Sequence, residues 1–383
     1  MNIGIDLRMV PYKIKRGWGW YSYNLVSNIL DIDKEDIFYL LYVFLRKGSK
    51  KYLLPHKDNS YNRMWRFPSS FLEFLWDNLN FPKIEILLFK KVDIFHSLCD
   101  FILPSSYALQ IVTIHDCVPL ILDPQKKFPF TVKFIRNIEK INKIKPRIII
   151  TDTENSKKDI LKFLQFPSQN IRVVYPGVSN EFKPLDIIDV KSYLKKFGLE
   201  YKKYILYVGA ADGDKNIEVL IEAFGKMLIT HSIPDDIYLV FVGSLNWNYH
   251  RLFNLIEGRG IENRCKFLGY VELDELVRIY NGAKVLVIPS LYEGFGLPVV
   301  EAIACGTPVI LSNTSCFPEV GGDAALYFDP YNSDELIEKI VDLFNMSDLE
   351  NLLIKRGLEN AKRFKWENSA TEVIKIYREI YYG

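Results

Sequence analysis

The sequence predicts an α/β protein with two doubly wound, Rossmann-like domains, each built on a parallel sheet. Three observations favour this class. Short apolar runs typical of buried strands recur along the chain, and amphipathic helical patterns, such as residues 216–228 and 273–283, lie between them. The length of 383 residues also exceeds that of a usual single domain. Strands that alternate with helices pair in parallel, and such sheets bind ligands at the carboxyl ends of their strands.

The strand-like runs follow one another in order through both halves of the chain. They read NIGIDL, VDIFHS, QIVTIHD, RIIITD and IRVVY in the first half, and YILYVG, IYLVFVG, CKFLGY, AKVLVIPS and TPVIL in the second. A turn-rich stretch, YPGVSNEFKPLD, separates the two series. We therefore predict an N-terminal domain over 1–185 and a C-terminal domain over 186–365.

The last segment, 366–383, has the pattern of an amphipathic helix. Its apolar residues share one face by spacing: Trp366, Ala370, Val373, Ile374 and Tyr377. We expect this helix either to close the second domain or to cross back and pack on the first.

Charge is divided unevenly between the halves. Residues 1–200 hold 31 Lys and Arg against 21 Asp and Glu, a net +10. The whole chain has 49 against 47, so residues 201–383 hold 18 against 26, a net −8. A basic front half and an acidic back half indicate two domains with different partners.

Composition excludes several classes of protein. A hydrophobic content of 49% with 25% charged residues is ordinary for a soluble globular chain. The five cysteines contain no C-x-x-C pair, so we expect neither a disulfide framework nor a zinc site, and a reducing cytoplasm fits best. The start MNIGIDLRMV lacks a signal-peptide layout, and the apolar run 37–45 is too short to span a bilayer. Nothing indicates a nucleic-acid partner.

One stretch carries most of the chemical information. Residues 291–310 read LYEGFGLPVVEAIACGTPVI, in which seven residues separate Glu293 from Glu301. The pattern predicts a strand over 283–290, a turn in which Gly294 and Gly296 are free to adopt positive φ, and a two-turn helix. Pro298 suits the first position of that helix and Gly306 suits the C′ position.

This arrangement suits a sugar nucleotide. A helix start offers free backbone N–H groups to a phosphate, and a carboxylate on each side can accept hydrogen bonds from hydroxyls. The plainer alternative is a turn glutamate followed by a glutamate that the helix dipole stabilises.

With these motifs, the chain resembles the retaining GT-B glycosyltransferases of family 4, the group with an E-x7-E motif. The resemblance is carried by YVGAADGDKNIEVLIEAF, the block FLGYVELDELVRIYNGAKVLVIPSLYEGFGLPVVEAIACGTPVILSN and PEVGGDAALYFDP. In the first half GIDLR, RGWGWYSYNL, VTIHDCVPL and IITDTENSKKDI fit more loosely. It implies a GT-B fold, a donor nucleotide sugar held mainly by the second domain, an acceptor on the first, and no metal ion or other cofactor.

The resemblance also implies roles for residues of the second half. Glu293 would bind hydroxyls of the donor sugar, Glu301 those of the ribose, and Lys215 would stabilise the leaving diphosphate. Backbone N–H groups of the turn would assist, namely those of Gly294, Phe295, Gly296 and Leu297, and Gly209 would let the nucleotide approach.

One departure from the family pattern concerns a second cation. Relatives often carry an arginine where this chain has Ala210 or Asp214. We expect Arg16 or Arg8 to replace it, or the helix dipole to bear more of the charge.

In the first half, the resemblance places His115 near the reacting carbon, and Asp116 would orient the acceptor or cap the next turn. Gly17 and Gly19 match a glycine loop after the first strand, which approaches the diphosphate or acceptor. Trp18 and Arg16 are candidate contacts for acceptor or phosphate, and either Trp18 or Trp20 would stack on a sugar or pack in the core.

Residues 126–147 combine a basic face with an apolar one, holding eight Lys and Arg and a single acidic residue, Glu139. A basic amphipathic helix can lie on anionic lipid, so we expect peripheral contact with the inner face of the cytoplasmic membrane, near a lipid-linked acceptor. The alternative is a core helix with a solvated basic face.

The sequence therefore predicts a hexosyltransferase, with mannose from GDP-mannose as donor and a saccharide or lipid-linked saccharide as acceptor, in surface polysaccharide biosynthesis. The remaining alternatives are a UDP- or ADP-sugar donor, a non-transferring GT-B sugar-nucleotide epimerase, and an inactive sugar-nucleotide-binding protein.

Overall fold

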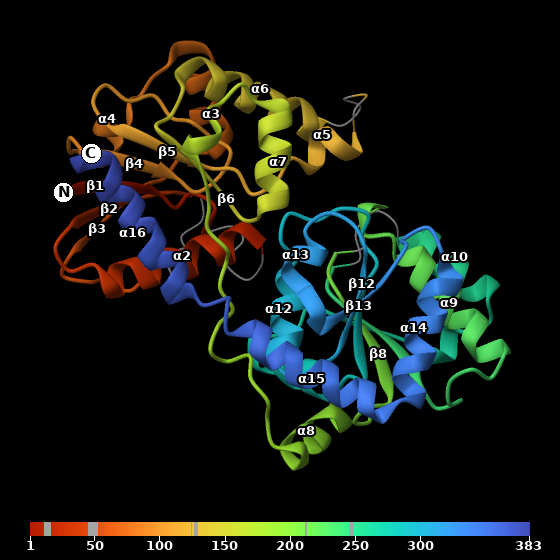
Figure 1. Ribbon diagram of the computed structural model, residues 1–383. Helices are drawn as coiled ribbons and strands as arrows, with labels where there is room; N and C mark the ends of the chain where they lie inside the picture. Colours follow the sequence, from red (N-terminus) through yellow and green to blue (C-terminus); the bar gives the residue numbers. More distant parts are fainter. Residues whose placement is uncertain (11–16, 45–52, 124, 126–128, 211–212, 245–248) are drawn as a thin grey trace. The chain divides into compact units, whose positions relative to one another are not determined.

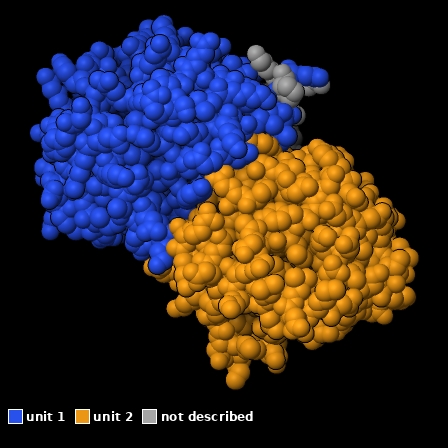
Figure 2. Space-filling model, in the orientation of Figure 1, with its two compact units in different colours: residues 1–177, 365–383 blue, residues 178–364 orange. Residues whose placement is uncertain are grey.

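The computed structural model describes the chain except for residues 11–16, 45–52, 124, 126–128, 211–212 and 245–248. The chain forms two compact units (Figure 2). Unit 1 comprises Met1–Gly177 and Lys365–Gly383, and unit 2 comprises Val178–Phe364. The sequence placed the boundary after residue 185, but it lies after Gly177. The reason is that the N–H of Val178 donates to the carbonyl of Phe364 (2.9 Å), which ties residue 178 into unit 2.

Unit 1 is built on a parallel sheet with strand order β3-β2-β1-β4-β5-β6-β7 (Figure 1). The strands are β1 Asn2–Asp6, β2 Ile37–Val43, β3 Ser60–Trp65, β4 Ile94–Ser97, β5 Leu109–Thr113, β6 Ile148–Thr151 and β7 Ile171–Val173. The helices described are α2 Gly17–Ile32, α3 Ser69–Leu79, α4 Ile84–Leu88, α5 Val118–Leu122, α6 Pro129–Ile144, α7 Glu154–Phe163 and α16 Trp366–Tyr382.

The residues of strand β2 show that both faces of this sheet are covered by helices. Its residues alternate between two cores, because successive side chains of a strand point to opposite faces. Phe38, Leu40 and Tyr42 join the core formed with α2 and α16. Tyr39, Leu41 and Val43 join the core formed with α3 and α4. A strand buried on both faces reads as an unbroken apolar run, as IFYLLYV does.

The C-terminal helix α16 crosses back to unit 1 and packs against α2. All five residues of its predicted apolar face are buried, and Tyr377 is completely so. Gly177 allows this return, since a Cβ there would lie 2.2 Å from the backbone nitrogen of Trp366. Of the two alternatives for this helix, packing on the first unit is the one observed, and closing the second is not.

Unit 2 is a second doubly wound unit, with strand order β10-β9-β8-β11-β12-β13 and all pairs parallel. Its strands are β8 Tyr204–Val208, β9 Tyr238–Val242, β10 Cys265–Gly269, β11 Val285–Ile288, β12 Val309–Ser312 and β13 Ala325–Phe328. Its described helices are α8 Ile187–Leu194, α9 Ile217–Ile229, α10 Tyr249–Gly258, α11 Leu273–Gly282, α12 Leu297–Ala304, α13 Phe317–Gly321, α14 Ser333–Asn345 and α15 Ser347–Ala361.

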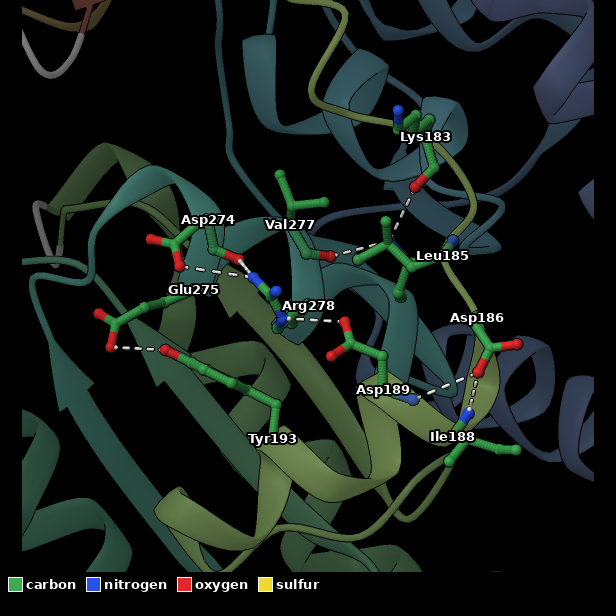
Figure 3. A network of polar contacts seen from close by, with 11 residues as sticks. Lys183, Leu185, Asp186, Ile188, Asp189, Tyr193, Asp274, Glu275, Val277 and Arg278 are labelled. Atoms are coloured by element: carbon green, nitrogen blue, oxygen red, sulfur yellow. Dashed lines mark hydrogen bonds and ion pairs between the residues drawn. The ribbon is translucent and has the colours of Figure 1, made fainter.

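A polar network fixes the first segment of unit 2 to helix α11 (Figure 3). Asp186 caps α8 by accepting from the N–H groups of Ile188 and Asp189. Arg278 of α11 then binds the carboxylate of Asp189 (3.2 Å), and Glu275 accepts from the hydroxyl of Tyr193 (3.0 Å). These contacts hold α8 against α11 at the entrance of the chain into unit 2.

Among the described residues, no helix combines the length and the hydropathy that crossing a bilayer requires.

Candidate active site

The predicted strand–turn–helix unit is present in unit 2, where β11 leads through a turn into α12. Gly296 has φ +84°, and a Cβ at this position would meet the ring of Phe317 at 3.0 Å. Gly294, by contrast, does not use the positive φ that a glycine is free to adopt. The side chain of Phe295 is buried and lies edge-on to Phe364, which anchors the turn.

Helix α12 begins at Leu297, with Pro298 in its second position rather than its first. Gly296 provides no side chain, and no side chain caps this helix start. Pro298 has no N–H, and the N–H of Val299 donates to the carbonyl of Gly296 (2.9 Å). Within the described part of the chain, the N–H of Leu297 is therefore the candidate contact for an anion at this helix start. Gly306 has φ +76° beyond the last residues of α12, as predicted for the C′ position.

Glu293 and Lys215 meet at the carboxyl edge of the sheet, although 78 residues separate them in sequence. The Lys215 ammonium donates to Glu293 Oε1 (2.9 Å), and Ser290 donates to the same oxygen (2.9 Å). Lys215 also lies 2.9 Å from Asp214 Oδ2. One ammonium thus stands between two carboxylates, directly beside the turn that precedes α12.

This pairing fixes the charge of Lys215. Burial alone would lower the pKa of Lys215, but the neighbouring charges of Glu293 and Asp214 raise it above its ordinary value. The ammonium is therefore a permanent cation at any physiological pH.

The loop that carries Lys215 is held in place by its neighbours. Asn216 adopts the left-handed conformation (φ 50°), and its amide donates to the carbonyls of Pro289 and Pro330. The carbonyl of Asp214 accepts from the N–H of Leu291 (2.9 Å).

Asp212 and Asp214 also have the spacing of a D-x-D motif. Asp212 lies outside the described residues, and the carboxylate of Asp214 binds Lys215.

Glu301, the second glutamate of the motif, lies on α12 and receives a hydrogen bond from the hydroxyl of Tyr280 (2.9 Å). Tyr280 is fully buried in α11, so it holds the carboxylate in one orientation. The sequence did not single out Tyr280. It was counted only as part of a helical pattern, and nothing in its spacing to Glu301 signals the contact.

A small apolar recess opens at the carboxyl ends of β8, β9 and β10. Gly209, a predicted donor-binding residue, belongs to its lining, and the rings of Phe241 and Phe267 stack within it at 4.7 Å. The other lining residues are Tyr207, Ile217, Val242, Gly243, Leu252 and Gly269. The sequence analysis found only the glycine.

The remaining predicted residues lie in unit 1. Gly17 has φ +53°, but Gly19 is buried within helix α2, so the glycine loop predicted there is instead a helix start. The helix persists because residues of its inner face, Tyr21, Leu25, Val26 and Ile29, are buried in the core. Trp20 stacks on Tyr23 at 6.2 Å. Arg16 lies outside the described residues.

His115 and Asp116 follow β5. The ring of His115 is buried, bonded to Asp152 and stacked on Trp18 at 5.8 Å. Asp116 accepts from the N–H of Val118 (3.0 Å) and so caps the next turn, one of its two predicted roles. Asp152, which the sequence analysis overlooked, follows the neighbouring strand.

Arg8 does not supply the second cation that the sequence analysis sought. Its guanidinium is buried, forms a two-pronged bond with Asp6 and lies 4.6 Å from the ring centre of Trp76. A guanidinium that is already paired and enclosed serves the core of unit 1.

Comparison with known proteins identifies the family of this chain. The model of the family "Glycosyl transferases group 1" matches residues 189–360. The chain is 30% identical over 279 residues to O-antigen chain mannosyltransferase B of Escherichia coli, covering 73% of this chain and 72% of that protein.

Solved structures show the same fold along the whole chain. Sucrose-phosphate synthase from Thermosynechococcus elongatus superimposes with a TM-score of 0.78 at 20% identity, covering 100% of this chain and 99% of that one. HepE from Anabaena, solved with UDP and glucose, gives 0.74 at 15% identity, covering 99% and 100%. The chain therefore belongs to the group 1 glycosyltransferases, and it is a glycosyltransferase with the GT-B fold.

Proposed function

We propose that this enzyme is a retaining transferase of family 4 that moves a hexose from a nucleotide sugar to a saccharide or lipid-linked saccharide. The observation that carries this proposal is the pairing of Lys215 with Glu293 beside the uncapped start of α12. A permanent cation, the N–H of Leu297 and a carboxylate are the groups that this proposal uses there. Together they match the diphosphate and the sugar hydroxyls of one ligand.

Each residue of the cluster then has a separate task. The N–H of Leu297 and the Lys215 ammonium bind the diphosphate and stabilise the charge that builds up on it as the sugar departs. Glu293 exchanges its bond from Lys215 for the sugar hydroxyls. Glu301, oriented by Tyr280, accepts from the ribose hydroxyls. The apolar recess beside Gly209 suits the flat face of a base.

The transfer step needs no side chain as nucleophile. We propose front-face displacement: the bond from the anomeric carbon to the phosphate oxygen breaks while the acceptor oxygen bonds to the same face. The leaving phosphate oxygen takes the acceptor's proton. Nucleoside diphosphate leaves, and the anomeric configuration is retained. Neither a metal ion nor another cofactor is required, because Lys215 and the helix start neutralise the diphosphate.

Mannose from GDP-mannose is the proposed donor, with surface polysaccharide biosynthesis as the setting. The similarity to a mannosyltransferase of O-antigen chains supports it. The similarity in fold to HepE, which was solved with UDP and glucose, keeps a UDP-linked hexose as the second candidate.

Product analysis with a panel of GDP-, UDP- and ADP-hexoses tests the proposal. With EDTA present throughout, GDP-mannose and a mannan-type acceptor should yield free GDP and an α-linked product, because the donor is an α-anomer and retention keeps that configuration. NMR of the anomeric proton reads the configuration. Free nucleotide should appear only when acceptor is present.

Three results would oppose the proposal. Epimerised donor without acceptor would indicate an epimerase, and binding without turnover would indicate an inactive binding protein. Activity that EDTA abolishes and Mg²⁺ restores would contradict independence from metal and would direct attention to Asp212 and Asp214.

The proposed membrane contact involves α3 as well as the basic helix α6. Lys133 of α6 pairs with Glu73 (2.8 Å), and both Arg136 and Lys140 pair with Asp77, so these cations are partly neutralised by α3. Helix α3 in turn buries Leu72 and Trp76 and leaves Phe71 and Phe74 more than half exposed. Two exposed phenylalanines beside basic side chains suit an anionic lipid surface better than the basic face alone.

Sedimentation with vesicles tests this contact. The enzyme should bind vesicles rich in phosphatidylglycerol, and the double variant Phe71→Ser, Phe74→Ser should bind about 10-fold less because it loses apolar burial in the bilayer. Ile188→Ser, at an exposed position of unit 2, is the control and should bind normally. Equal binding by both variants would remove α3 from the contact.

A further inference from the structure

His115 has hydrogen-bond partners on both sides that can only accept. It follows β5, the strand between β4 and β6. Its Nδ1 lies 2.8 Å from Asp152 Oδ2, directly after β6, and its Nε2 lies 3.2 Å from the carbonyl of Leu98, after β4. A carboxylate and a carbonyl have no proton to give, so both ring nitrogens must carry hydrogen for both contacts to be hydrogen bonds.

A second buried histidine shows the contrasting case. His96, on β4, is bonded through Nδ1 to the hydroxyl of Tyr377 and through Nε2 to that of Thr113. Hydroxyls can donate or accept, so a neutral ring satisfies both contacts. Burial lowers the pKa of His96 to about 3, helped by the nearby charge of His115. The two histidines therefore differ in their partners: those of His96 are satisfied by a neutral ring, whereas those of His115 can both only accept.

The surroundings of His115 favour the charged ring. Asp152 is 5% exposed, and within the described chain its second oxygen, Oδ1, is buried without a hydrogen-bond partner. A buried carboxylate with a single partner requires that partner to be a cation. The ring of Trp18 stacks on His115 with an interplanar angle of 14°, and Tyr21 meets it edge-on at 4.6 Å. An indole face attracts a cation.

Within the described part of the chain, the charged groups that act most strongly on the ring favour its protonated form. Burial alone would lower the pKa of His115, but the charge and hydrogen bond of Asp152, together with the charge of Asp116, raise it above its ordinary value. Asp100 also interacts electrostatically with His115, and burial raises the pKa of the Asp100 carboxyl. His96 is uncharged, because burial lowers its pKa.

We propose that Asp152 is a positioning residue that holds His115 as an imidazolium, so that the ring supports the transfer reaction as a fixed cation of unit 1 and never acts as its base. This inference rests on the proposed function for its role in transfer, whereas the charge state of the ring does not.

The pH dependence follows from the sign of the shift. A raised folded-state pKa contributes stability that is fully present below the ordinary histidine value of about 6.5 and is lost as pH rises through the folded value. The stability advantage of wild type over Asp152→Asn should therefore be largest near pH 6 and should shrink in alkaline solution.

NMR of enzyme labelled with ¹⁵N-histidine tests the charge directly, with His115→Gln assigning the signal among the five histidines. In wild type at pH 7.5, both ring nitrogens of His115 should have protonated shifts. In Asp152→Asn they should show one protonated and one unprotonated nitrogen. His96 should remain neutral in both. A neutral His115 in wild type, or a ring in Asp152→Asn that stays doubly protonated, would overturn the proposal.

Kinetics supply the second readout. Wild-type kcat/KM should show no histidine titration between pH 6 and 8. Asp152→Asn should lose about 10-fold over that range as its His115 deprotonates. A loss equal at every pH would mean that Asp152 is merely structural, and that outcome contradicts the proposed role. Should no donor be transferred at all, the proposed function fails while the NMR result still decides the charge of His115.

Discussion

Lys215→Ala is expected to weaken binding of the nucleoside diphosphate at least 10-fold and to reduce kcat/KM at least 100-fold. The Lys215 ammonium is paired with both Glu293 and Asp214. Without it, these two carboxylates would repel the diphosphate. A 100-fold loss corresponds to about 2.7 kcal/mol of transition-state stabilisation. Calorimetry with GDP and initial rates with the best donor measure the two effects.

Lys226→Ala serves as the matched control, since Lys226 lies on α9 soon after Lys215 and pairs with Asp334 on the surface. It should bind GDP and transfer sugar normally. Wild-type affinity for GDP in Lys215→Ala would show that another group binds the diphosphate. Removing the ammonium leaves two carboxylates unpaired, which also costs stability. Circular dichroism therefore checks that a loss of GDP binding in Lys215→Ala is not caused by unfolding.

Glu293→Gln should separate binding from transfer. The glutamine keeps the size of the side chain but loses the charge that accepts strongly from sugar hydroxyls, so kcat/KM should fall about 100-fold. Affinity for GDP alone should be unchanged or higher, because Lys215 loses one of its two carboxylate partners and becomes more available to phosphate.

The informative feature is that only Lys215→Ala should lose affinity for GDP, although both variants should lose activity. Glu257→Gln, on the exposed surface of α10, controls for a general effect of lost charge. If Glu293→Gln transferred sugar at the normal rate, the residue would have no part in the site. If it lost GDP affinity together with activity, its role would be to shape the loop.

Elements whose residues interact with near neighbours in sequence could be predicted. The apolar runs identified most strands, and the spacing of Trp366, Ala370, Val373, Ile374 and Tyr377 identified the buried face of α16. Strands β2, β3 and β13 were not among the predicted runs. β3 lies at the edge of its sheet, and its sequence, SYNRMW, has neither a long apolar run nor a regular alternation. The glycine pair in RGWGWY indicated a loop, but burial of the inner face of α2 outweighed the low helix propensity of Gly19.

Within the site, the resemblance located residues but not their partners. Glu293 and Lys215 were both selected, yet their direct bond follows only from the parallel sheet that brings the loops after β8 and β11 together. Asp152 was missed because its role depends on β6 lying beside β5, which places it against a histidine 37 residues away. Contacts of this kind are decided by strand order, and local pattern carries no information about it.

The most direct test of the account is a crystal structure of the enzyme with an unreactive donor analogue, such as GDP-2-fluoro-mannose. We predict that the diphosphate lies on the N–H groups at the start of α12 and on the Lys215 ammonium. The hexose should contact Glu293, and the ribose should contact Glu301. A diphosphate bound elsewhere, with the bond between Lys215 and Glu293 intact, would contradict the account.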